Sequence, residues 1–335
     1  MQAITISHHF LHALLEGYIV RGYNPKELLN KAGIPAQIMK SSRIRISAES
    51  YAKLSYAVTT ELKDESFGQL AEALPIGTFE LTARACFSRH SLEGSLYQWV
   101  ISSNLLNKNL QTDIIETADS ISISINCQRR AGIIGHYVVE TTLLTIQRFH
   151  CWLSKEFIPL EAVELNYPEP NFSHEYRSLF YGAPITYNAK RNAITFSKSN
   201  LTAPIIRDRQ ELKDLMTESQ LKIITQPRKS SSPAILVRMW IEKLINKGNR
   251  NPQLEVAAEH IGLTSQTLRR RLRKEGTSFQ KIKEDTRRDM AIYLINSGNI
   301  SVENIAYKLG YSEASTFIRA FKKWTGLTPL TYRNL

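Results

Sequence analysis

Apolar positions in the first 225 residues follow a helical period in some stretches and a period of two in others. Ile121, Ile123 and Ile125 alternate with serines, which predicts a half-buried strand. This part of the chain is therefore predicted to be an α+β domain with a small sheet. The helical stretches are 8–20, 24–31, 47–62, 64–74, 91–106 and 135–155. The predicted strands are 112–116 and 120–127, a hairpin turning at Ala118-Asp119, followed by 161–167, 184–188 and 193–197.

The apolar period stops at residues 225–234, TQPRKSSSPA, where two prolines, a serine run and two basic charges predict a linker. A helical stripe resumes after Pro233 and begins an all-α region. We therefore divide the chain into an N-terminal domain over residues 1–224, the linker over residues 225–234, and a C-terminal domain over residues 235–335.

The C-terminal region repeats one pattern, at residues 256–280 and again at residues 304–333. Each copy has a short apolar helix, a turn of three or four residues and a second helix rich in Arg and hydroxyl groups. Gly262 and Gly310 stand where the first helix of each copy ends, a position that favours positive φ. The repeated pattern predicts two helix-turn-helix motifs.

The second helix of each motif has a predicted cap and a predicted buried face. Thr264 and Ser312 are placed to cap these helices. A long helix from about Gln280 to Ser297 is predicted to join the two motifs and to fix their spacing. The i, i+4 pairs that would bury one face of each second helix are Leu268 with Leu272 and Phe317 with Phe321.

The opposite face of both second helices carries side chains that suit nucleic-acid binding. Arg can bridge guanine, Gln can bridge adenine, and Lys and the outer Arg hold phosphates. A solvated basic face could explain one such helix, but a second copy 48–50 residues later argues against that interpretation. We predict that the two helices enter successive major grooves, spaced by about 34 Å. The predicted DNA-binding residues are Gln266, Thr267, Arg269, Arg270, Arg273, Ala314, Ser315, Thr316, Arg319, Lys322 and Lys323.

The net charge is concentrated in the same region. Residues 234–335 contain 18 Lys and Arg against 9 Asp and Glu, so they carry nine of the chain's twelve net positive charges. Such a distribution is expected of a domain that binds phosphates.

Cysteines and targeting signals indicate the compartment. Cys86, Cys127 and Cys151 are isolated and odd in number, which favours reduced thiols over a disulfide framework. The first 20 residues lack the features of a signal peptide, and no apolar run reaches the length of about 18 residues that a membrane span needs. We expect a soluble, cytoplasmic protein without membrane contact.

Residues 236–335 resemble the tandem helix-turn-helix domain of the AraC/XylS family of bacterial transcription regulators. Leu330 and Thr331 depart from the family pattern, which often has a small or polar residue there. The residues that carry the resemblance are Arg287, Ala291, Leu294, Ile305, Ala306, Leu309, Gly310, Tyr311, Ser312, Ser315, Phe317, Arg319, Ala320, Phe321, Lys322, Trp324, Gly326, Pro329, Tyr332 and Arg333.

Residues 15–210 resemble, less specifically, the sensor domain of one branch of that family, an arabinose-binding-like domain. The matching phrases are GYNPKELLNKAGIP, SLEGSLYQWV and LFYGAPITYNAKRNAITFSKSNLTAPI. The resemblance implies a regulator whose partners are double-stranded DNA, RNA polymerase and a small-molecule effector. It also implies self-association, and a homodimer stays an open expectation.

An effector pocket is expected where aromatic and polar side chains share two predicted helices of the N-terminal domain. A mostly apolar pocket with one Arg would suit a carboxylic acid. Ordinary core packing of the aromatic rings stays open as the alternative. The candidate effector-binding residues are Arg84, Trp99, His136, Tyr137, Arg148 and Trp152.

Metal and catalytic chemistry find little support in the sequence. His8, His12 and Glu16 share a helix face that could hold a metal, but a solvated face explains them better. We expect no metal, no cofactor and no catalytic residues.

The sequence thus favours an effector-responsive DNA-binding regulator, with activation as the expected sign. An effector-independent architectural DNA-binding protein and an enzyme with a DNA-targeting domain are the alternatives. The operator, the effector and the oligomeric state are left open.

Overall fold

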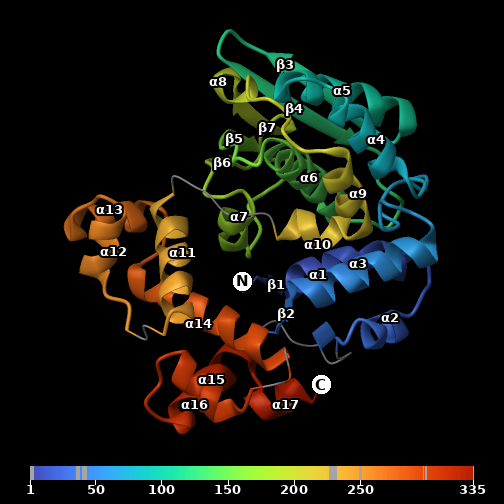
Figure 1. Ribbon diagram of the computed structural model, residues 1–335. Coiled ribbons are helices and arrows are strands. Elements are labelled where there is room, and N and C mark those ends of the chain that lie inside the picture. Colours follow the sequence, from blue (N-terminus) through green and yellow to red (C-terminus); the bar gives the residue numbers. More distant parts are fainter. Residues whose placement is uncertain are drawn as a thin grey trace. The chain divides into compact units, whose positions relative to one another are not determined.

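The computed structural model describes residues 4–34, 38–39, 44–225, 232–248, 251–296, 298 and 300–334 (Figure 1). These residues group into two compact units. The first contains the described parts of Met1–Leu11, Leu29–Tyr51 and Arg228–Leu335, and the second contains those of His12–Leu28 and Ala52–Pro227. Most of the predicted linker, residues 226–231, lies outside the described residues.

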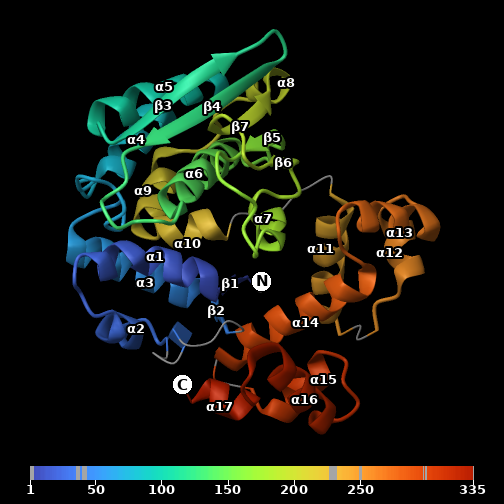
Figure 2. The same ribbon diagram turned by 180° about the vertical axis from the view of Figure 1, so that it is seen from behind.

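The second unit is built around a five-stranded sheet in the order β3-β4-β7-β5-β6 (Figure 2). The predicted hairpin is confirmed, because β3 and β4 pair antiparallel with Glu116 opposite Ile121. β4 and β7 pair antiparallel, as do β7 and β5, whereas β5 and β6 are parallel. Ile121 and Ile123 are fully buried, as their alternation predicted. The strands are β3 (Leu110–Glu116), β4 (Ser120–Cys127), β5 (Leu160–Glu164), β6 (Ile185–Thr186) and β7 (Asn192–Ser197).

Two predicted helices pack on this sheet. α6 (Tyr137–Ser154) contacts β4 and β7, and α5 (Leu92–Leu106) contacts β3 and α6. Ser91 Oγ caps α5 by accepting a hydrogen bond from Gly94 N at 3.2 Å. The further helices of this unit are α4 (Thr78–Phe87), α7 (His174–Leu179), α8 (Lys198–Leu201), α9 (Arg209–Thr217) and α10 (Ser219–Ile224). The α+β prediction is confirmed.

The predicted helix over residues 64–74 is wrong, because these residues form a loop. The buried Asp64 carboxylate accepts hydrogen bonds from the backbone N–H groups of Ser66, Gly68 and Leu74 at 2.8, 3.1 and 2.8 Å. These side-chain bonds compete with the helical pattern for the same donors. Gly68 also adopts a φ of 79°, which ends any helical run.

Three helices have residues in both units, and all three confirm the sequence predictions. They are α1 (His8–Val20), α2 (Lys26–Lys31) and α3 (Ala48–Leu62). Asn24 Oδ1 accepts from Lys26 N at 3.1 Å at the start of α2, and Ser47 Oγ accepts from Ser50 N at 3.1 Å at the start of α3.

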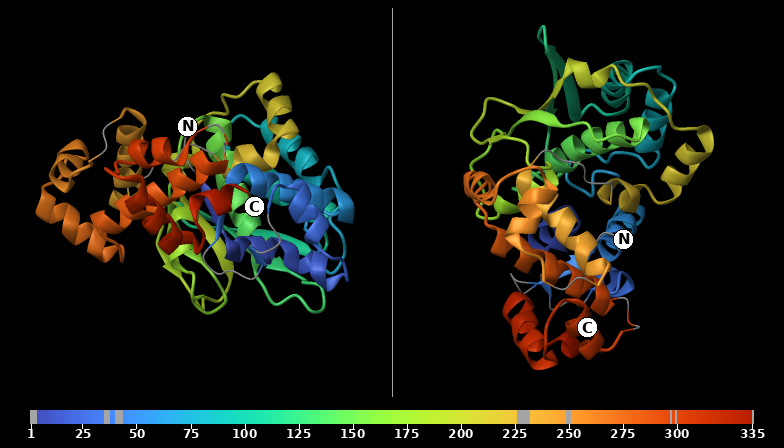
Figure 3. Two further views of the ribbon diagram at one scale, coloured as in Figure 1. Left: turned by 90° about the horizontal axis from the view of Figure 1, so that it is seen from below. Right: turned by 60° about the vertical axis from the view of Figure 1, so that its left-hand side comes forward.

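The first unit contains the predicted C-terminal helices, and its two helix-turn-helix motifs are joined by one long helix, α14 (Figure 3). Ser232 caps α11, which has Pro233 in its first turn. The all-α prediction for residues 235–335 is confirmed over their described part. The helices are α11 (Pro233–Asn246), α12 (Leu254–His260), α13 (Ser265–Lys274), α14 (Phe279–Asn296), α15 (Val302–Lys308), α16 (Ala314–Thr325) and α17 (Pro329–Arg333). Within the described ranges, no helix is long and apolar enough to cross a membrane.

The first unit also contains two short strands that the sequence did not predict. β1 (Thr5–Ser7) and β2 (Arg45–Ser47) pair antiparallel, with Thr5 opposite Ser47 and Ser7 opposite Arg45. Both strands contact α14. We call this pair the β1–β2 ribbon. It brings residues from the start of the chain into the same unit as the helix-turn-helix motifs.

Candidate nucleic-acid interface

The first motif, α12 and α13, has the geometry that the sequence predicts. Gly262 follows α12 with a φ of 71°. Thr264 is the N-cap of α13, and its Oγ1 accepts from Thr267 N at 3.2 Å. Leu268 and Leu272 are 0% and 1% exposed, so one face of α13 is buried.

The second motif, α15 and α16, repeats this arrangement with one correction. Gly310 has a φ of 84° and the Phe317 and Phe321 rings are fully buried. The predicted Ser312 cap is wrong, because the turn is one residue longer and Glu313 occupies the N-cap position without a side-chain cap bond. The Glu313 carboxylate instead accepts from Ser315 Oγ at 3.1 Å.

The two recognition helices, α13 and α16, place one Arg at the same point of their outer faces. Arg270 lies two residues after Leu268, and Arg319 lies two residues after Phe317. At 3.6 residues per turn, each Arg is about half a turn away from the buried stripe. Both side chains are exposed. Of the other predicted contacts, Thr267 and Ala314 are half-buried and the rest are exposed, namely Gln266, Arg269, Arg273, Ser315, Thr316, Lys322 and Lys323.

Charge pairing on this face is weak. Arg269 Nη2 lies 3.6 Å from Glu255 Oε1, and both side chains are about two-thirds exposed at 67% and 64%. An exposed pair of this kind contributes little to stability. The Arg269 guanidinium can therefore exchange this carboxylate for a phosphate at small cost.

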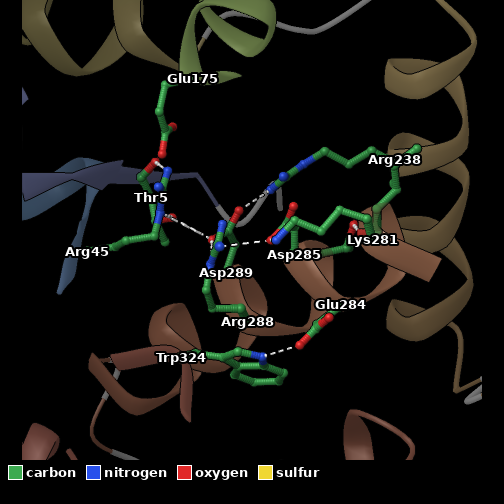
Figure 4. A network of polar contacts seen from close by, with 12 residues as sticks. Thr5, Arg45, Glu175, Arg238, Lys281, Glu284, Asp285, Arg288, Asp289 and Trp324 are labelled. Carbon is green, nitrogen blue, oxygen red and sulfur yellow. Dashed lines mark hydrogen bonds and ion pairs between the residues drawn. The ribbon is translucent and has the colours of Figure 1, made fainter. Parts of the chain in front are cut away.

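α14 is bonded to the second motif and to α11, the helix that precedes the first motif. On the side of the second motif, Trp324 Nε1 donates to Glu284 Oε1 at 3.0 Å (Figure 4). On the side of the first, Arg238 of α11 donates from Nη2 to Asp289 Oδ2 at 2.6 Å. The relative placement of the two motifs therefore depends on the side chains along α14.

Asp289 is the centre of a buried ionic cluster that sequence reasoning missed (Figure 4). Its carboxylate accepts from Thr5 Oγ1 at 2.7 Å and from Arg288 Nε at 3.0 Å, and Arg45 Nε lies 3.5 Å away. Burial alone would raise the pKa of Asp289, but Arg288, Arg238 and Arg45 lower it far below its usual range. A lone Asp within a helix carries no local signal of partners hundreds of residues away.

The predicted effector residues fall into three separate places. Trp99 and Trp152 lie on either side of Phe149, with ring centroids at 5.7 and 5.9 Å, and Arg148 is on the same stretch of α6. His136 and Tyr137 lie at the start of α6, about 18 Å from Arg148 at 1.5 Å per residue. Arg84 is exposed and paired with Glu80 at 2.6 Å, so it joins neither group.

The group around Phe149 contains buried polar atoms without partners. Among the described residues, Trp99 Nε1, Gln147 Oε1 and Arg148 Nε have no hydrogen bond. Arg148 is 7% exposed, and within the described part of the chain its Nη atoms donate to the carbonyls of Leu179, Ile223 and Ile224 at 3.4 Å. Buried polar atoms are rarely left unpaired in a closed core, so these atoms suit a bound polar molecule.

A second buried polar group lies near the N-terminal end of α6. Glu140 Oε1 accepts from Tyr167 OH at 2.8 Å and also from Tyr176 OH, and the His136 ring stacks on Tyr167 at 3.8 Å. Burial raises the pKa of Glu140 and lowers that of His136 to about 4. The His136 imidazole is therefore expected to be neutral at physiological pH.

On the α1 face that carries His8, His12 and Glu16, the Glu16 carboxylate has a structural role. Glu16 accepts hydrogen bonds from Ile134 N at 2.9 Å and Gly135 N at 3.2 Å, so it anchors a loop. Over the part of the chain that the structure describes, no group of three His, Cys, Asp or Glu side chains could hold a metal ion. All three cysteines are free thiols.

Comparisons with known proteins match both parts of the chain. The family profile described as "Arabinose-binding domain of AraC transcription regulator, N-term" matches residues 22–205, and the one described as "Helix-turn-helix domain" matches residues 257–335. The ornithine utilization regulator of Pseudomonas aeruginosa is 23% identical over 97% of this chain and 95% of its own length.

Two further comparisons cover different shares of the chain. The transcriptional regulator VqsM of P. aeruginosa is 37% identical over 83 residues, which are 25% of this chain and 26% of that protein. The crystal structure of the transcriptional regulator CdpR from P. aeruginosa aligns over 99% of both chains with 19% identity and a TM-score of 0.34.

Proposed function

Since the chain belongs to the AraC family of transcription regulators, we propose that it reads two successive major grooves through α13 and α16 and responds to a carboxylate effector. DNA binding and transcription regulation follow from the family. The groove geometry, the effector class and the residue roles are our proposal.

The observation that carries the two-groove proposal is the equivalence of Arg270 and Arg319. Each lies opposite the buried stripe of its own recognition helix, and each is exposed. Two equivalent Arg residues on two helices joined by α14 suit two similar half-elements, with a guanine as the preferred base at each. The flanking Lys322 and Lys323 would hold phosphates.

The proposed effector anchor is Arg148. It is a buried guanidinium that donates to three main-chain carbonyls at the long distance of 3.4 Å, and its Nε has no hydrogen-bond partner among the described residues. A carboxylate offers shorter, charge-assisted bonds in a bidentate geometry. Since two of those carbonyls belong to α10, a carboxylate on Arg148 would release the end of that helix. Trp99 and Trp152 would line the apolar part of the site.

Replacing Arg148 by Met should abolish stabilisation of the full chain by carboxylic acids while preserving the apolar stem of the side chain. The probes are straight-chain and amino-acid-derived carboxylic acids and the matching amides. In a thermal-shift titration, an acid at a hundred times its Kd stabilises the wild type by about 2.7 kcal/mol. The amide should give no such shift.

The matched control for this substitution is Arg84→Met, at an exposed Arg that forms an ion pair with Glu80. Arg84→Met should keep the full acid-dependent shift. A shift that survives Arg148→Met, or one that the amides produce equally well, would assign the effector to another site.

The remaining partners that we propose are a second copy of the chain and RNA polymerase. We also propose that the protein acts in the cytoplasm, where bacterial DNA lies. An exposed apolar ridge on α5 supports self-association. Tyr97, Ile101 and Leu105 stand at i, i+4 spacing and are 36%, 52% and 80% exposed. Two such ridges could pair antiparallel in a homodimer.

The proposed function is tested by selecting duplexes from a random-sequence library with the full-length protein at two salt concentrations. We expect one discrete site with two half-elements about one helical turn apart. Footprinting then counts the bound copies, and transcription from the selected site with RNA polymerase gives the sign of regulation. Diffuse binding with a steep salt dependence would instead favour the architectural alternative.

A further inference from the structure

Arg45 of the β1–β2 ribbon contacts two helices that flank the helix-turn-helix motifs, α14 between them and α17 after the second. Its guanidinium approaches Asp289 at 3.5 Å, and Asp289 is in turn held by Arg238, which belongs to the helix that precedes the first motif. The main-chain oxygen of Arg45 accepts a hydrogen bond from Tyr332 OH in α17, which follows the second motif. One residue of the ribbon therefore connects the two ends of the DNA-binding helices.

The ribbon is firmly held in this position. Arg45 Nε donates to Thr5 Oγ1 at 2.8 Å and Arg45 Nη2 donates to Thr5 O at 3.0 Å, so the two strands are joined by side chains as well as by their ladder. Thr5 Oγ1 then donates to Asp289 at 2.7 Å. Ile4, Ile44 and Ile46 are each at most 6% exposed, which adds apolar packing. A short, paired and buried ribbon can hold the helices that it contacts at a fixed separation.

The charges of the cluster favour one specific placement of β2, α11 and α14 relative to one another. Asp289 is met by Arg side chains from three different elements, β2, α11 and α14 itself. Arg238 Nε also donates to Glu242 Oε1 at 3.1 Å. Buried ionic groups are costly to misplace, because a shifted partner leaves an uncompensated charge. The cluster therefore favours a single relative placement of these elements.

We propose that the β1–β2 ribbon fixes the spacing of the two recognition helices, with Arg45 as its positioning residue. The proposal rests on the proposed two-groove function. A chain beginning at the C-terminal domain would then contain both motifs but would lack the element that sets their separation. The ribbon also runs directly into the rest of the chain, since β1 ends at Ser7 and α1 begins at His8, and β2 ends at Ser47 and α3 begins at Ala48. Effector binding could change groove spacing through these two connections.

The test compares Arg45→Ala and Tyr332→Phe with the wild type, all as full chains. Arg45→Ala removes the link to Asp289, and Tyr332→Phe removes only the hydroxyl that bonds to Arg45. The probes are the duplex selected from a random library by the wild type, a copy with one half-element scrambled, and a copy with two base pairs inserted between the elements. The insertion rotates one element by about 70° relative to the other. Arg84→Ala is the control.

We expect Arg45→Ala to weaken binding to the two-element duplex by about tenfold or more, because linked binding loses its effective concentration when the geometry is wrong. Its affinity for the one-element duplex should stay within about twofold of the wild type. The loss of affinity caused by the two-base-pair insertion should be smaller for Arg45→Ala than for the wild type. Tyr332→Phe should shift these quantities in the same direction by a smaller factor, and Arg84→Ala should match the wild type.

Two results would overturn the ribbon proposal alone. One is wild-type spacing preference in both variants, and the other is an equal loss on one-element and two-element duplexes, which would indicate a role in folding only. Failure of the proposed function has a different signature, because the wild type itself would then select no two-element site. That result overturns the ribbon proposal as well.

Discussion

Asp289→Ala should lower the local stability of α14 by about 3 kcal/mol, the lower end of the cost of breaking a buried ion pair. The substitution leaves Arg45, Arg238 and Arg288 without their shared carboxylate. Their side chains are 11%, 14% and 19% exposed, and Arg238 and Arg288 keep Glu242 and Asp285, which softens the loss. Hydrogen exchange of the α14 amides measures this stability within its own unit. Protection should fall by about a hundredfold.

The matched control is Asp285→Ala, one turn earlier in the same helix. Asp285 shares Arg288 with Asp289 and also binds Lys281, at 2.8 and 3.1 Å, but its side chain is 26% exposed. A partly exposed pair is worth at most about 1 kcal/mol. Similar protection in the two variants would show that the Asp289 cluster contributes no more than a surface pair.

The pH dependence of this contribution has a definite sign. The Arg neighbours hold the pKa of Asp289 below the value of about 3.9 in an unfolded chain. A depressed acidic pKa gives stability that is complete above the unfolded pKa and is lost as the pH falls towards the folded one. The difference between wild type and Asp289→Ala should therefore be constant from about pH 5 to 8 and should shrink below about pH 4.

The parts of the fold that could be predicted are those whose signal lies in neighbouring residues of the sequence. The Ile121–Ile125 alternation, the Thr264 cap and the paired Leu268 and Phe317 stripes each depend on residues within a few positions of one another. Periodicity and capping rules detect such features. The same rules failed at residues 64–74, where the carboxylate of one buried Asp satisfies backbone donors that a helix would have used.

The missed features depend on residues that are distant in sequence. Thr5 and Asp289 are bonded across a separation of 284 residues, and each strand of the ribbon has only three residues. A three-residue strand is too short for its alternation to stand out. α13 and α16 were predictable because the same glycine and the same apolar i, i+4 spacing occur twice in the sequence. The candidate effector residues do not form one group, since Trp99 and Trp152 both contact Phe149 whereas Arg84 and His136 lie elsewhere.

Arg270→Ala and Arg319→Ala should each weaken binding to the selected duplex by about 1–3 kcal/mol and should relax base preference at one position. The reason is geometric, since each guanidinium lies half a turn from its buried stripe and so at the centre of the face that we propose enters a groove. Arg270→Ala should act on the half-element read by α13 and Arg319→Ala on the one read by α16. Quantitative binding to duplexes mutated at single positions measures both effects.

Two comparisons separate base reading from general attraction to DNA. Arg271→Ala removes the same charge from the same helix, but Arg271 is exposed about a quarter turn from the buried stripe, away from the centre of the outer face. Lys323→Ala removes a predicted phosphate contact, which should weaken all duplexes alike and lower the salt slope by about one. If Arg270→Ala behaves like either control, with no change of preference at any position, then α13 binds the backbone and a different face of the motif reads the bases.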